Sequence, residues 1–167
     1  MAVKSFLKFN KGVSIIEILI VIFIMGFAFA SFSALVSFSL QASGIANQTS
    51  RANDLAQEAM EAIRDFRNQT SWDADGLGIL TAGVSYKIQE AVPSAWELVL
   101  GEEDVGVFNR TIIFKNVSRD VIDNIESIYN LINDDPDTRK VEVVISWEER
   151  GRSHQVFLNT YFTNWDQ

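Results

Sequence analysis

A long apolar run near the start of the chain contains a single ionisable side chain, Glu17. Between Lys11 and Arg51 no other charged residue or histidine occurs, and residues 18–30 are all apolar apart from one glycine. An acidic side chain at the centre of a membrane helix costs roughly 2.5–3.5 kcal/mol on insertion scales. A chain that only crossed a bilayer would insert more easily without this acid. Glu17 is therefore a candidate functional residue that lacks a partner within its own segment.

The apolar stretch, residues 13–40, is longer than the roughly 20 residues that span a hydrocarbon core. Lys4, Lys8 and Lys11 precede it without any acid, although the chain as a whole has a net charge of −8. The positive-inside rule therefore predicts that the N-terminal end stays in the cytoplasm and that the acidic remainder is exported. Because phosphate binding needs a basic face, we expect no nucleic acid as a ligand of the exported part alone.

Two kinds of processing fit the start of the chain. An ordinary secretory signal peptide would be cut after the small-x-small site at residues 28–30. The acid inside the apolar core, and the low polarity that continues over residues 31–40, argue against that interpretation. The alternative is a cut on the cytoplasmic side after Gly12, which leaves Val13 as the new N-terminus and keeps the apolar segment. Composition alone does not decide between these two cleavage sites.

The N-terminal pattern resembles that of type IV prepilins, in which a short basic leader ends in glycine and the fifth mature residue of an apolar helix is glutamate. Here the leader is residues 1–12 and the acid is Glu17. The resemblance implies that a prepilin peptidase cuts between Gly12 and Val13 and N-methylates Val13. It also implies that Glu17 pairs with the free N-terminal amine of a neighbouring subunit during assembly. Ser14 and Glu17 match a helix capping box as well, in which the acid only satisfies a backbone N–H.

After residue 40 the periodicity stays helical but becomes amphipathic. We expect one helix over residues 13–67, with residues 13–40 as the transmembrane or filament-core segment and the rest packed on a head formed by residues 68–167. The predicted fold class is α+β: a long N-terminal helix packed on a C-terminal antiparallel β-sheet. A loop is predicted at 68–83, a short amphipathic helix at 120–133, a hairpin turn at 149–152, and strands at 85–90, 95–100, 107–117, 140–148 and 154–163.

The C-terminal part carries a second, less specific resemblance. Residues 135–141, Trp147 and residues 161–165 resemble the closing hairpin of V-type minor pilins and I-type minor pseudopilins. This implies a minor pilin or pseudopilin: a single-pass cytoplasmic-membrane protein with an exported head that later joins an extracytoplasmic filament. The implied partners are other pilin or pseudopilin subunits, bound through the N-terminal helix, together with the prepilin peptidase and the membrane.

Two other functions stay open at this point. One is a tip adhesin or DNA-uptake minor pilin, in which the same scaffold presents a ligand-binding head. The other is a membrane-anchored secreted domain that has no connection with filaments.

Side chains suited to catalysis or metal binding are few. His154 is the only histidine, it lies in a strand pattern without a nucleophile beside it, and the chain has no cysteine. The acidic runs at 73–75 and 134–137 lack the twelve-residue spacing of a calcium-binding loop, so we interpret them as solvated turns. We therefore expect no enzymatic activity, no cofactor and no metal site.

Processing at Gly12 gives the first testable prediction. Intact-mass analysis of the membrane-extracted protein should find a chain that begins at Val13 and carries one added methyl group. Gly12→Leu should leave the uncut precursor in the membrane. A mature chain that begins at Ser31 would instead identify an ordinary signal peptide and remove the basis of the prepilin resemblance.

Overall fold

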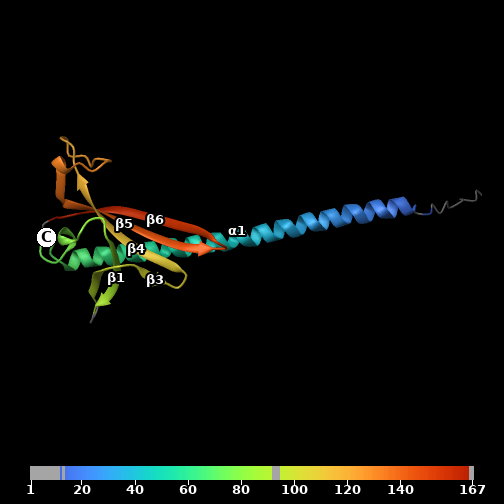
Figure 1. Cartoon of the computed structure of the whole chain (residues 1–167), viewed down its shortest axis with the longest axis horizontal. Coiled ribbons are helices and arrows are strands. Elements are labelled where there is room, and N and C mark those ends of the chain that lie inside the picture. Colours follow the sequence, from blue (N-terminus) through green and yellow to red (C-terminus); the bar gives the residue numbers. More distant parts are fainter. Residues whose placement is uncertain (1–11, 13, 92–94, 166–167) are drawn as a thin grey trace, which may run out of the picture. The chain divides into compact units, whose positions relative to one another are not determined.

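The computed structural model describes residue 12 and residues 14–91 and 95–165. Within them lies one long helix, α1 (Ile15–Gln69), followed by a sheet of six strands (Figure 1). The predicted α+β class is confirmed. The chain divides into two compact units, Met1–Gly44 and Ile45–Gln167. The remaining elements are η1 (Leu77–Ile79), β1 (Ser85–Ala91), β2 (Ala95–Leu100), β3 (Glu103–Val105), β4 (Phe108–Ser118), η2 (Leu131–Asn133), β5 (Asp134–Glu149) and β6 (Arg152–Thr163).

Helix α1 is uninterrupted because its sequence contains no proline and only two glycines, Gly26 and Gly44. It ends at Gln69, where the Thr70 hydroxyl donates to the carbonyl of Phe66 at 2.7 Å. That bond satisfies one of the carbonyls that a helix end leaves without an internal partner. The observed end lies within two residues of the predicted one, and the predicted first residue, Val13, lies outside the described residues.

The sheet is antiparallel at every described pairing, with the order β2-β1-β4-β5-β6. Strand β3 also pairs with β4, so β1 and β3 share one edge of β4 while β5 occupies the other. The β5–β6 turn places Arg150 at φ 52° and Gly151 at φ 74°. Two successive positive φ values are typical of the tight hairpin turn that was predicted there.

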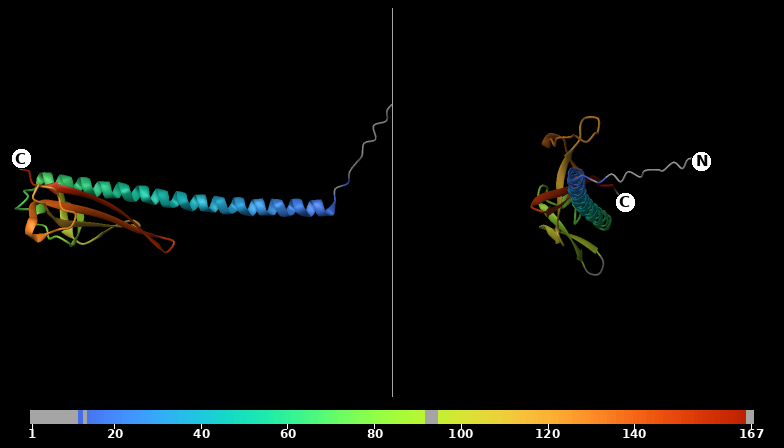
Figure 2. Two further views of the ribbon diagram at one scale, coloured as in Figure 1. Left: turned by 90° about the horizontal axis from the view of Figure 1, so that it is seen from above. Right: turned by 90° about the vertical axis from the view of Figure 1, so that its right-hand side faces the viewer.

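The core of the second unit lies between the sheet and residues 45–69 of α1, which run along one side of the sheet (Figure 2). The helix contributes mainly small side chains, whereas the sheet contributes branched and aromatic ones from alternate positions of β4 and β5, as expected for a strand with one buried face. Alanine at the contact lets the helix backbone approach the sheet closely. The principal buried residues are Ala52, Ala56, Ala59, Ile63, Phe66, Phe108, Ile112, Phe114, Val141, Val143, Ile145 and Trp147.

One inward-facing position of β4 is charged. Arg110 lies between Phe108 and Ile112 on the buried face, and its guanidinium contacts Glu103 of β3 at 2.6 Å and Glu58 of α1 at 3.2 Å. Burial of an unpaired charge is strongly unfavourable, so these two carboxylates make the position tenable. Arg110 thereby connects the helix, β3 and β4 in one ion-pair network.

The segment after α1 is a loop, as predicted, but it is packed and not free. It folds around Trp72, whose indole N–H donates to the carbonyl of Pro136 at 3.2 Å. Gly78 lies so close that a Cβ there would stand 2.6 Å from the Trp72 carbonyl oxygen. Glycine is required here by the close approach of the backbone to Trp72. Leu77 beside it is fully buried, so this loop closes one end of the core.

The predicted amphipathic helix at 120–133 is wrong. The segment is an irregular loop with one short turn, η2, at its end, and β5 begins at Asp134 instead of residue 140. The carboxylate of Asp120 accepts hydrogen bonds from the backbone N–H groups of Ile122 and Asn124, both at 2.9 Å. Asp123 adopts a positive φ of 70°. Aspartate that captures nearby N–H groups in this way favours a turn over a helix.

The second compact unit should fold without the apolar segment. We expect a fragment of residues 45–167 to be a soluble monomer with a cooperative thermal transition and a mixed helix and strand circular-dichroism spectrum. Ile63→Asp should abolish that transition, because a carboxylate would replace a fully buried side chain. Asn53→Asp on the exposed side of the same helix is the matched control and should leave the transition unchanged. An aggregated or disordered wild-type fragment would contradict the proposed core.

Candidate functional site

The sequence singled out three residues at the start of the chain. Gly12 is exposed, Val13 lies outside the described residues, and Glu17 is in the first turn of α1 with its side chain exposed. The backbone carbonyl of Ser14 accepts hydrogen bonds from the N–H groups of Glu17 at 3.0 Å and Ile18 at 3.2 Å. Both bonds use the Ser14 carbonyl, and neither involves the Ser14 N–H, from which the acid of a capping box would accept. An acid in the first turn is also favourable to the helix dipole.

The apolar segment that follows Glu17 has the properties of a membrane-spanning helix. By length and composition α1 is able to cross a bilayer, and none of its most apolar 18-residue window is buried. Two of its serine hydroxyls bond within the helix, since Ser31 donates to Phe27 O and Ser33 to Phe29 O, each at 2.9 Å. Such bonds remove the cost of placing a hydroxyl in lipid. Glu17 is therefore the one ionisable group that this segment would bring into an apolar environment.

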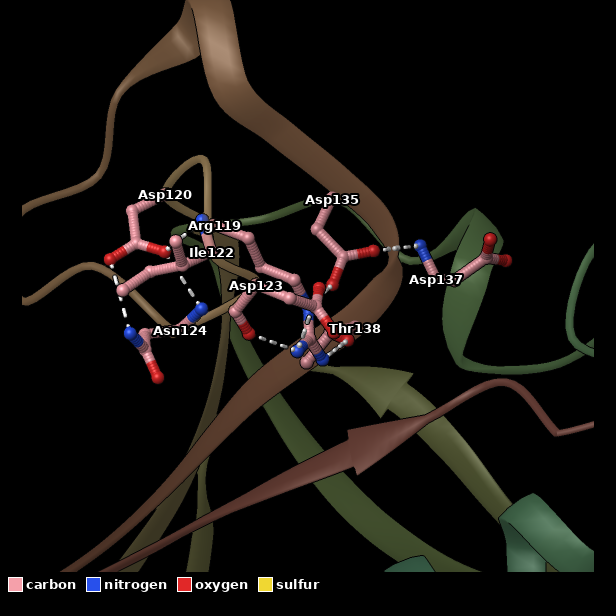
Figure 3. A network of polar contacts seen from close by, with 8 residues as sticks. All are labelled: Arg119, Asp120, Ile122, Asp123, Asn124, Asp135, Asp137 and Thr138. Atoms are coloured by element: carbon pink, nitrogen blue, oxygen red, sulfur yellow. Dashed lines mark hydrogen bonds and ion pairs between the residues drawn. The ribbon is translucent and has the colours of Figure 1, made fainter.

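In the head, the most extensive polar network centres on Arg119, at the end of β4 (Figure 3). Its Nε donates to the carboxylate of Asp135 at 2.6 Å, its Nη2 to the hydroxyl of Thr138 at 3.2 Å, and its Nη1 to the carbonyl of Asp123 at 3.0 Å. One guanidinium thus joins the loop of residues 119–133 to the start of β5. Charge-assisted bonds of this kind are among the stronger hydrogen bonds in proteins.

Two carboxyl groups in this region have a lowered pKa. For Asp135, burial acts to raise the pKa, but hydrogen bonds from Thr138 and Arg119, together with the Arg119 charge, outweigh it and lower the pKa. For Asp120, the backbone N–H of Asn124 is the main cause of the lowered pKa. Both groups therefore favour the folded head most when they are ionised.

Arg67 is a second buried arginine, near the end of α1. Its guanidinium lies 3.8 Å from the ring centroid of Trp165 and donates to the carbonyl of Thr163 at 2.9 Å. Burial lowers the pKa of Arg67. The stacking of a guanidinium on an indole face explains how this charge is held where the chain returns from β6 to the helix.

The side chains considered above for catalysis and metal binding lie apart from one another in the structure. His154 stacks on Trp147 with ring centroids 5.4 Å apart, in a packing role on β6. Asp75 accepts a hydrogen bond from the N–H of Ser71, and Asp135 is engaged by Arg119. Within the described ranges, no three Asp, Glu, His or Cys side chains gather as a metal site. Sequence reasoning missed Arg110 and Arg119, because each has a partner on another element, Glu58 and Asp135 respectively, that only the fold brings near.

No family model, curated protein or solved structure matches the chain. Its function is therefore inferred from two of its own features: the apolar helix that carries Glu17 and the folded head that follows.

The Asp135 interactions predict a loss of stability in acid. Because the folded-state pKa of Asp135 is lowered, its contribution is complete above the unfolded-state pKa of about 3.9 and is lost as the pH falls through the lower folded-state pKa. Asp135→Asn should lower the free energy of unfolding at pH 7 by about 1.5–3 kcal/mol, the usual worth of a hydrogen bond to a charged group. It should also flatten the decrease in stability below pH 4.

Thermal unfolding of the wild-type and Asp135→Asn fragments of residues 45–167, between pH 7 and pH 2, checks this prediction. Asp73→Asn, at an exposed carboxylate of the same head, is the control and should leave the melting temperature unchanged at pH 7. An Asp135→Asn head whose stability falls in acid as steeply as that of the wild type would contradict the assigned role.

Proposed function

We propose that the chain is a type IV pilin-like subunit, a minor pilin or pseudopilin, of a membrane-assembled extracytoplasmic filament. In this proposal α1 holds the protein in the cytoplasmic membrane with the head exported. Prepilin peptidase cuts between Gly12 and Val13 and methylates Val13, and the processed subunit then joins the filament through the apolar part of its helix. The subunit has a structural role and not an enzymatic one.

The observation that carries this proposal is the position of Glu17. It is the only ionisable residue in an exposed apolar segment, and it lies one turn from the N-terminus that cleavage after Gly12 would create. Cleavage after Gly12 creates a free N-terminal amine, which is a new positive charge at the level of Glu17. A carboxylate buried in an apolar filament core would be heavily penalised without such a partner. An ordinary membrane anchor offers no reason to retain it.

The architecture supports the same proposal. The apolar part of α1 exposes large side chains around its whole circumference, as a segment surrounded by lipid or by neighbouring helices requires. Residues 45–69 of the same helix have one buried face and belong to a compact head with its own core. A subunit that moves from membrane to filament needs both parts: a helix that suits two apolar environments and a head that stays folded in water.

Glu17 substitutions test the proposal. Glu17→Ala and Glu17→Gln should be inserted and cleaved like the wild type, because removal of a charge only eases membrane entry. Both should be depleted from sheared filaments, or leave assembly inactive if the subunit primes it. Without the Glu17 carboxylate, the N-terminal ammonium of the neighbouring subunit would stay unpaired in the apolar core. A cost of about 2.5–3.5 kcal/mol for that charge corresponds to roughly 100-fold lower incorporation. Glu17→Gln separates charge from size, since the amide fills the same space but cannot neutralise an ammonium group.

Immunoblots of sheared filament and membrane fractions provide the measurement. Ser33→Ala is the matched control, because it changes a polar side chain of the same apolar segment that bonds within its own helix. It should be incorporated at the wild-type level. If Glu17→Gln and Glu17→Ala were both incorporated at the wild-type level, Glu17 would have no role in assembly and the proposal would lose its main support.

A further inference from the structure

The loop that joins β4 to β5 exposes an unusual amount of aliphatic surface. Five of its side chains are between 74% and 99% exposed: Val121, Ile122, Ile128, Leu131 and Ile132. Figure 1 shows this segment, in orange, standing out beyond the end of β4 and the start of β5. Single exposed aliphatic residues are ordinary on a protein surface, but a cluster on one loop of a water-exposed domain usually marks an interaction site.

Hydrogen bonds hold this loop in one conformation. The N–H of Arg119 donates to the carbonyl of Asn133 at 3.0 Å, and the N–H of Glu126 donates to the carbonyl of Ser118 at 2.8 Å. The hydroxyl of Ser118 accepts from the N–H of Asn130 at 3.0 Å. The base of the loop is therefore closed by its own backbone, in addition to the Arg119 side-chain network. A surface that is ordered before binding loses less conformational entropy when a partner arrives.

Several carboxylates are exposed near the aliphatic side chains. Asp123 has a side chain that is 84% exposed, and Asp134 and Asp137 are exposed at the start of β5. Arg119 is the only Lys or Arg between residues 119 and 137, and its guanidinium is engaged by Asp135, Thr138 and, at 3.5 Å, Asp123. Two lysines from the sheet, Lys115 and Lys140, lie beside Ile125 and Tyr129 at the base of the loop. The outer part of the loop thus combines aliphatic contact area with exposed carboxylates, and the lysines lie at its base.

This charge pattern selects the kind of partner. A second copy of the chain docked through the same loop would place carboxylates against carboxylates, and like charges at an interface are strongly disfavoured. A membrane with anionic head groups would be repelled for the same reason. A protein surface that has an apolar groove edged by lysine or arginine complements both the aliphatic side chains and the exposed carboxylates.

We propose that residues 120–133 are a docking surface for a second protein whose contact site is an apolar groove flanked by basic side chains. Val121 and Ile132, the two most exposed of the five aliphatic residues, enter the groove, and Asp123 meets a basic side chain at its edge. This inference is based on the loop alone and does not depend on the proposed filament role. It assigns to the head a partner of a different chemical kind from the apolar helices that α1 would contact.

Site-specific photocrosslinking of the full-length protein in the cells that make it tests the proposal. A benzoylphenylalanine at position 132 should give an adduct with one other protein, at least about tenfold more abundant than at Phe157, a 52% exposed position on β6. Mass spectrometry of the joined peptides should place the partner's attachment point among aliphatic residues with Lys or Arg beside them. An adduct with a second copy of the chain, with lipid, with an acidic surface, or of equal abundance at position 157 would overturn the proposal.

Affinity for the protein so identified then provides a quantitative test. Ile132→Ser and Val121→Ser should each raise the Kd of the full-length protein at least about tenfold, as expected for anchor residues of an interface. Asp123→Asn should weaken binding less and reduce its dependence on salt. Phe157→Ser is the control and should bind like the wild type. An unchanged melting temperature would show that each variant is folded, and wild-type affinity of both serine variants would refute the docking role.

Discussion

The head depends on the close approach of α1 to its sheet. Ala52, Ala56 and Ala59 are almost completely buried and provide a flat strip against which the branched side chains of β4 and β5 can pack. A larger side chain in this strip would force the two layers apart, and overpacked cores are destabilised by typically 1–3 kcal/mol. The reach of Arg110 to Glu58 and to the carbonyl of Leu55 depends on the same spacing. The ion pairs of the core are thus possible only because the helix strip is built of alanine.

The two parts of α1 suit different environments, one apolar and one aqueous, although they form one continuous helix. Up to residue 43 every described helical side chain is exposed, and apart from Glu17 the charged residues are absent. From residue 51 onward charged residues return, at exposed positions except for the buried Arg67. A helix that is apolar all round suits lipid or a bundle of similar helices, whereas a one-sided helix suits a domain in water. The change occurs without a proline, so the helix itself continues through it.

The sequence revealed the elements whose periodicity is long and regular. The helix, four of the strands and the β5–β6 turn were predicted to within a few residues, because alternating or helical patterns repeat several times in each. Strand β3 has three residues and cannot show a pattern. The loop at 120–133 has helical spacing of its apolar residues, but the Asp120 carboxylate competes for the N–H groups that a helix would need. Arg110 occupies an inward position whose partners could not be known without the fold.

Strand β1 is attached to the rest of the sheet over a short distance. It pairs with β4 only through Ser85 with Ile113 and Tyr86 with Ile112, whereas its pairing with β2 continues from Tyr86 to Ala91. Strands β1 and β2 therefore have few backbone pairings to the rest of the sheet. Their amides should exchange with solvent through a local opening that leaves β4, β5 and β6 intact. Tyr86, whose ring packs edge-on against Phe114, lies at the boundary between the strands expected to open and those expected to stay paired.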